Sequence, residues 1–122
     1  MGQSYEGSMT MGRPVVFFDI AATDAPALSG FYSELFDWRI DAANPMGYGL
    51  VEAGEGGIPG GIGSGEAKGV SIVVAVDDVQ SYLDKAEALG GKTLIPPYDV
   101  PDTGTLAEFT DPQGNRIGLW KR

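Results

Sequence analysis

The chain has 122 residues, of which 43 % are hydrophobic, and this is enough for one domain with its own core. Its formal net charge of −9 argues against nucleic-acid binding, because an acidic surface repels phosphate. The absence of both cysteine and histidine excludes disulfides, Cys or His metal ligands and any Ser-His or Cys-His catalytic pair.

The N-terminal residues 1–13 are polar and contain no apolar stretch that could act as a signal peptide. We interpret them as a disordered tail that precedes a single folded domain over residues 14–122. No segment is long and apolar enough to cross a membrane, and the absence of cysteine fits a reducing compartment. These features together predict a cytoplasmic protein.

The first half of the folded region predicts one strand, one helix and three strands. Residues 15–20 form a β-branched and aromatic run that is typical of a buried strand. Asp24 is the expected N-cap of a helix that runs to Phe36, with apolar residues at helical spacing. Short strands are expected at 37–42, 48–53 and 59–63.

The third of these short strands lies in a glycine-rich segment, residues 54–65. The segment lacks the GxxxxGK[ST] pattern and is followed by a strand rather than a helix, so no helix N-terminus is available to bind phosphate. We interpret it as a strand and linker between two units.

The second half predicts the same order of elements. A strand at 70–76 precedes a helix that is capped by Asp78 and ended by Gly90-Gly91. A strand over 92–95 is expected to end at Pro96-Pro97. Strands at 105–110 and 116–120 then form a hairpin around the turn at 111–115.

The two helix caps, Asp24 and Asp78, are 54 residues apart, and this offset aligns the first strand and helix of both halves without gaps. The sequence therefore predicts an α+β fold made of two βαβββ units, residues 14–65 and 66–122.

This order of elements, together with the stretches FYSELFDW, AVDDV and FTDPQGNRIGLW, resembles the vicinal oxygen chelate superfamily. That group includes glyoxalase I, extradiol dioxygenases, bleomycin-resistance proteins and methylmalonyl-CoA epimerase. The resemblance implies that the two units form a cup-shaped half-barrel around a small-molecule cavity. It also implies a homodimer, since the family usually buries shared sheet edges or cup rims in this way.

In metal-dependent members, ligands come from the first and last strands of the units, and the matching positions here are Phe17, Ser71 and Gly118. These residues cannot form a first-row metal site, which needs imidazole, thiolate or carboxylate ligands. The resemblance therefore predicts a protein with no metal and no other cofactor. Carboxylates alone could hold Mg²⁺ or Ca²⁺, and Asp19, Glu52 and Glu108 are the candidates. Solvation, or pairing with arginines such as Arg116, is the simpler explanation for such carboxylates.

Strand alternation and the third-strand turn place a set of aromatic, small and acidic side chains toward the expected cup. We assign no catalytic residue, and the predicted ligand-binding residues are Phe17, Asp19, Met46, Tyr48, Ser71, Glu108 and Trp120. The predicted function is metal-free binding of an aromatic or cationic organic molecule, similar to that of bleomycin-resistance proteins. The alternative is a glyoxalase- or dioxygenase-like enzyme that uses a carboxylate-bound metal or a carboxylate base.

Overall fold

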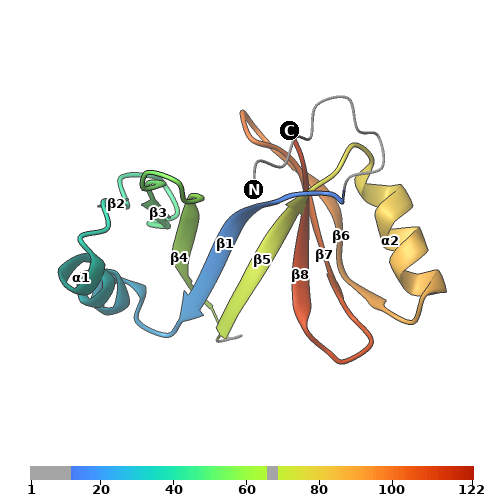
Figure 1. The fold of residues 1–122 in the computed structure, drawn as a ribbon, viewed down its shortest axis with the longest axis horizontal. Helices are drawn as coiled ribbons and strands as arrows, with labels where there is room; N and C mark the ends of the chain where they lie inside the picture. The colour runs from blue at the N-terminus through green and yellow to red at the C-terminus, as the bar shows by residue number, and fades with distance from the viewer. Residues whose placement is uncertain (1–11, 66–68) are drawn as a thin grey trace, which may run out of the picture.

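The computed structural model describes residues 12–65 and 69–122, and these form two helices and one eight-stranded sheet (Figure 1). The first unit contains β1 (Val15–Ala22), α1 (Ala25–Phe36), β2 (Ile40–Asp41), β3 (Gly49–Val51) and β4 (Gly60–Ser64). The second contains β5 (Gly69–Ala75), α2 (Val79–Ala88), β6 (Lys92–Val100), β7 (Gly104–Thr110) and β8 (Arg116–Lys121). The predicted α+β class and the repeated βαβββ order are confirmed. Nearly all of the predicted N-terminal tail lies outside the described residues.

The sheet is open and has the strand order β2-β3-β4-β1-β5-β8-β7-β6. The two units meet where β1 and β5 pair antiparallel, and each of these strands also pairs in parallel with the last strand of its own unit. The repeat seen in the sequence thus corresponds to a repeated pairing pattern, in which the first strand of each unit pairs in parallel with the last strand of that unit. The sheet of this chain is open, whereas the resemblance led us to expect a cup-shaped half-barrel.

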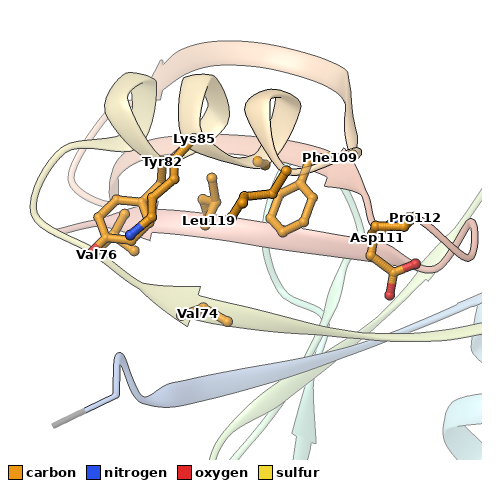
Figure 2. A pocket seen from close by; sticks show the side chains of 11 residues that line it. Val74, Val76, Tyr82, Lys85, Phe109, Asp111, Pro112 and Leu119 are labelled. Carbon is orange, nitrogen blue, oxygen red and sulfur yellow. The ribbon is translucent and has the colours of Figure 1, made fainter.

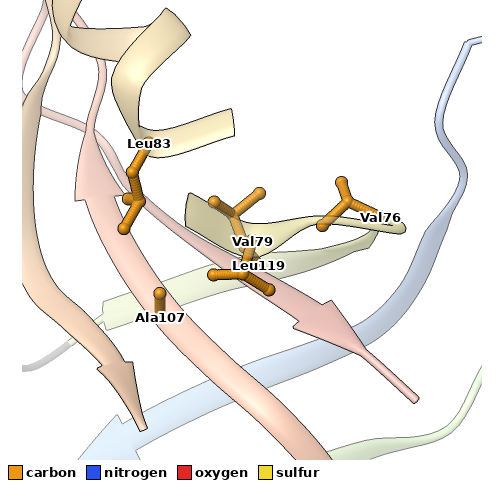
Figure 3. Close-up of a cluster of buried hydrophobic side chains, with 5 residues drawn as sticks. All are labelled: Val76, Val79, Leu83, Ala107 and Leu119. Atoms are coloured by element: carbon orange, nitrogen blue, oxygen red, sulfur yellow. The ribbon is translucent and has the colours of Figure 1, made fainter. Parts of the chain in front are cut away.

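The two helices lie at opposite ends of the sheet, α1 on the side of β2, β3 and β4 and α2 on the side of β6 (Figure 1). Both begin at the predicted caps, because the Asp24 and Asp78 carboxylates accept hydrogen bonds from the backbone N–H groups of Ala27 and Ser81, each at 3.1 Å. Each helix covers a separate core. The core under α2 contains Val76, Val79, Leu83, Ala107 and Leu119 (Figure 3), and the core under α1 contains Ile20, Ala25, Val51 and Ile62.

One predicted boundary is wrong, since Pro96-Pro97 do not end their strand and β6 continues to Val100. The reason is position. β6 is one of the two edge strands, so one of its sides has no neighbouring strand that requires an N–H donor. The pairing with β7 also shifts register between Ile95 and Tyr98, around the two prolines.

Among the described residues, neither helix has the length and apolar character that crossing a bilayer would require.

Candidate functional site

Two cavities lie on opposite faces of the second unit. We infer this because residues next to each other in the same strand line different cavities. Val74 and Phe109 line one cavity, whereas their neighbours Val73 and Glu108 line the other. The first, of about 390 Å³, lies between α2 and the sheet, and Figure 2 shows Tyr82, Phe109 and Leu119 around it. Its walls are almost entirely apolar.

The cavity under α2 has few polar groups that could orient a ligand. The Asp111 carboxylate at its edge is already used within its own turn, where it accepts hydrogen bonds from the N–H groups of Gln113 and Asn115, both at 2.9 Å. The Asn115 side-chain amide also donates to it, and these bonds hold the pKa of Asp111 below its usual value. We therefore take the second cavity, where several polar side chains converge, as the candidate site.

The candidate cavity has a volume of about 340 Å³ and is lined by five strands and Tyr48. Its floor follows from the strand register: Val73 of β5 pairs with Phe17 of β1 on one side and with Gly118 of β8 on the other. Gly118 in turn pairs with Glu108 of β7. These four residues form a row across the sheet, and the alternation along each strand directs the side chains of Phe17, Val73 and Glu108 to one face.

The structure brings six of the seven predicted ligand-binding residues together around this cavity: Phe17, Asp19, Tyr48, Ser71, Glu108 and Trp120. Met46 is not among the lining residues. It lies in the turn before β3 and is 87 % exposed. Tyr48, two residues further along, reaches the cavity where Met46 does not.

The lining residues that were missed from the sequence include Tyr98 and Leu106. Tyr98 was missed because the prolines before it were expected to end the strand. Leu106 shares strand parity with Glu108, so the alternation along β7 could have identified it.

At one end of the cavity, the lining carboxylates of Asp19 and Glu108 flank Arg116, which is not itself a lining residue. The Arg116 Nη2 atom lies 3.9 Å from Asp19 Oδ2, and its Nε atom lies 3.8 Å from Glu108 Oε1. Both distances exceed the hydrogen-bonding range, so the contacts are ion pairs without a direct hydrogen bond. The three side chains are between 24 % and 28 % exposed. When all three are ionised, this end of the cavity carries one net negative charge.

Glu108 is the least satisfied of these groups. Its Oε1 atom is buried and finds no hydrogen-bond donor within the described part of the chain. Burial raises the pKa of Glu108, the neighbouring Asp19 charge raises it further, and Arg116 opposes the shift. A bound molecule that donates a hydrogen bond to Oε1 would satisfy an atom that is otherwise without a partner.

Tyr48 is held at both ends. Its hydroxyl donates a hydrogen bond to Asp19 Oδ1, while the Asn44 side chain accepts from the Tyr48 N–H at 3.0 Å and donates to its carbonyl oxygen at 2.7 Å. Burial, followed by the bond to Asp19, raises the pKa of Tyr48 well above its ordinary value. Its phenol therefore stays protonated and remains a donor at neutral pH.

The other end of the cavity is aromatic. The Phe17 and Trp120 rings meet edge to face with centroids 6.5 Å apart. The Trp120 Nε1–H donates to the Thr103 carbonyl at 3.0 Å, and the Arg122 guanidinium lies 4.9 Å from the Trp120 ring centre. Between the aromatic and charged ends Gly118 contributes no side chain, so the floor is low there.

The residues present do not fit the metal site of the superfamily. Phe17, Ser71 and Gly118 line the cavity and supply no imidazole, thiolate or carboxylate. In residues 12–65 and 69–122 there is also no cluster of three or more His, Cys, Asp or Glu side chains arranged to hold a metal ion. Of the alternative carboxylate set, Asp19 and Glu108 share the cavity, but Glu52 lies elsewhere and pairs with Arg39 at 4.0 Å.

A glyoxalase-like domain model matches residues 15–120. The chain belongs to the glyoxalase-like domain family. CFP32 of Mycobacterium tuberculosis, whose glyoxylase name is provisional, is 34 % identical over 113 residues, covering 84 % of this chain and 43 % of the relative. The anthracycline biosynthesis protein DnrV of Streptomyces peucetius is 25 % identical over 131 residues, covering 91 % of this chain and 47 % of DnrV.

The fold is also that of solved members of the superfamily. A glyoxalase/bleomycin resistance protein/dioxygenase superfamily member from Vibrio splendidus 12B01 superposes with a TM-score of 0.65 at 12 % identity, over 91 % of this chain and all of that one. The suspected relationship to the vicinal oxygen chelate superfamily is thereby confirmed at the level of fold. The chain spans less than half the length of the curated relatives that it matches.

Proposed function

We propose that this glyoxalase-like chain binds a small aromatic molecule, without a metal ion, in the cavity that Gly118 opens. The observation that carries the proposal is the replacement of the superfamily's ligand positions by Phe17, Ser71 and Gly118. These residues create an aromatic wall and a low floor where a metal site would otherwise stand. The carboxylates of Asp19 and Glu108 and the hydroxyl of Tyr48 gather at one end, which suits a ligand with a flat apolar body and one polar substituent.

One relative supports the aromatic character of the ligand. DnrV is named for the biosynthesis of anthracyclines, which contain fused aromatic rings. The activity and substrates of this chain are proposals of ours, because it matches less than half of that protein and of CFP32.

The experiment is a binding titration of simple phenols and naphthols by calorimetry, with three variants. Trp120→Ala removes part of the aromatic wall and should weaken binding by about tenfold, the usual value of one aromatic contact. Gly118→Leu places a side chain in the floor of the cavity and should abolish binding. Met46→Ala is the matched control, because Met46 is exposed and does not line the cavity. Equal affinities for all four proteins would contradict the proposal.

A second candidate function rests on Glu108. Its raised pKa and its Oε1 atom, which has no hydrogen-bond partner among the described residues, suit a group that takes a proton from the bound molecule and returns it. In that case the chain would be a metal-free enzyme with a carboxylate base. Glu108→Gln would then abolish turnover and leave ligand affinity within about threefold of the wild type. Under the binding function alone no turnover exists to be lost.

A further inference from the structure

The two units of the repeat differ in what covers an equivalent glycine of the sheet. Gly61 of β4 pairs with Asp19 of β1, as Gly118 of β8 pairs with Val73 of β5. Asp19 and Val73 are related by the 54-residue offset of the repeat. Gly61 is therefore the counterpart of Gly118, the glycine at the floor of the candidate cavity.

The space above these two glycines is filled in one unit and open in the other. A Cβ atom added at Gly118 would have a single close neighbour, Val73 Cγ2 at 3.1 Å. A Cβ atom at Gly61 would overlap the phenol ring of Tyr48, and one at Gly63 would lie 2.8 Å from two atoms of the same ring. The Tyr48 ring thus lies directly on the bare backbone of β4, at the place that corresponds to the open cavity.

Tyr48 is also positioned as the wall between the two halves of this face. It is among the residues that line the candidate cavity, and its hydroxyl is bonded to Asp19, which lines the cavity as well. The backbone of Tyr48 is fixed by two hydrogen bonds to the Asn44 side chain, within an otherwise exposed turn. The ring is therefore anchored from the turn and from the sheet.

We propose that Tyr48 determines the size of the aromatic molecule that the site accepts. This inference rests on the proposed binding function. With the ring in place, the ligand is confined to the half of the face around Gly118. Without the ring, the space above Gly61 and Gly63 joins the cavity, and a molecule with one more fused ring fits across both halves.

The test compares two probes that differ in size, 1-naphthol and 1,2-dihydroxyanthraquinone, on the wild type and on Tyr48→Ala and Tyr48→Phe. We expect Tyr48→Ala to raise the ratio of anthraquinone affinity to naphthol affinity at least about tenfold above that of the wild type. Tyr48→Phe keeps the ring and should retain the wild-type ratio of the two affinities. If Tyr48→Ala does not fold, Tyr48→Leu, which also lacks the ring, must show the same gain.

The outcomes separate this role from the binding function itself. Naphthol binding by the wild type, with the same affinity ratio in Tyr48→Ala, overturns the role of Tyr48 and leaves the binding function standing. A loss of affinity for both probes in Tyr48→Ala also overturns it, because the ring would then be part of the binding surface. Failure of every form to bind either probe contradicts both proposals.

Discussion

The two counterpart glycines should respond in opposite directions to the same added methyl group. Gly118 has no positive φ, and the only close contact of a new Cβ is with one Val73 methyl group. Val73 lines the open cavity, so its methyl group has room to shift by the few tenths of an ångström that this contact requires. Gly118→Ala should then raise the free energy of unfolding by about 0.5 kcal/mol, because alanine reduces the freedom of the unfolded chain. Gly61→Ala should instead lower the free energy of unfolding, since its methyl group must displace the Tyr48 ring.

Displacement of the ring breaks the hydrogen bond from Tyr48 to the Asp19 carboxylate, and a bond to a charged group contributes about 2 kcal/mol. The two variants should thus differ by about 2.5 kcal/mol. At about 4 °C per kcal/mol, the melting temperatures of the two variants should lie about 10 °C apart. Urea unfolding followed by tryptophan fluorescence measures the difference directly.

A double-mutant cycle tests whether the Tyr48 ring causes the destabilisation by Gly61→Ala. In the Tyr48→Ala background the ring is absent, so Gly61→Ala should lose most of its penalty, with a coupling free energy of about 1.5 to 2 kcal/mol. Gly118→Ala serves as the control and should have the same effect in both backgrounds. Equal destabilisation by Gly61→Ala with and without the Tyr48 ring would refute the packing of Tyr48 on β4.

Three further predictions concern the charged end, the ligand positions and the assembly. Glu108→Gln should stabilise the protein near neutral pH, and the gain should fade as the pH falls through the raised pKa of Glu108 toward the ordinary pKa of glutamate. A carboxyl group with a raised pKa in the folded protein costs stability as the pH rises through that pKa, and the glutamine has no such cost. Urea unfolding at several pH values measures the difference between variant and wild type. A stabilisation by Glu108→Gln that persists at low pH would contradict burial of the charged carboxylate as its cause. The pair Phe17→His and Gly118→Glu should create Zn²⁺ affinity measurable by calorimetry, because both positions face the same cavity; no gain would mean that they do not converge on one point. The homodimer implied by the resemblance stays a prediction, and a monomer in light scattering at all accessible concentrations would exclude it.

The parts of the fold that repeat were predictable from the sequence. The caps Asp24 and Asp78 fixed the offset between the units, and strand parity then placed Phe17, Asp19 and Ser71 on one face. The helical starts follow from local side-chain to backbone hydrogen bonds, which depend on residues only three positions apart. Local chemistry of this kind is visible in a single sequence.

The features that were not predictable depend on where a strand lies in the sheet. Pro96-Pro97 would end an interior strand, but they are tolerated in β6 because it is the edge, and Tyr98 was missed for that reason. The position of the Tyr48 ring on Gly61 and Gly63 depends on packing between the turn before β3 and the strand β4, which are not adjacent in the sequence. Periodicity could suggest that Tyr48 faces the cavity, but not that it fills one half of the face.

The measurement that tests the central claim most directly is a naphthol titration of chelator-treated protein, repeated with Mg²⁺, Ca²⁺ or Zn²⁺ added. Metal-free binding predicts one ligand per chain with an affinity that changes by less than about twofold in all conditions. Binding that appears only after a metal ion is added would contradict the claim, and carboxylate-based metal chemistry at Asp19 and Glu108 would take its place.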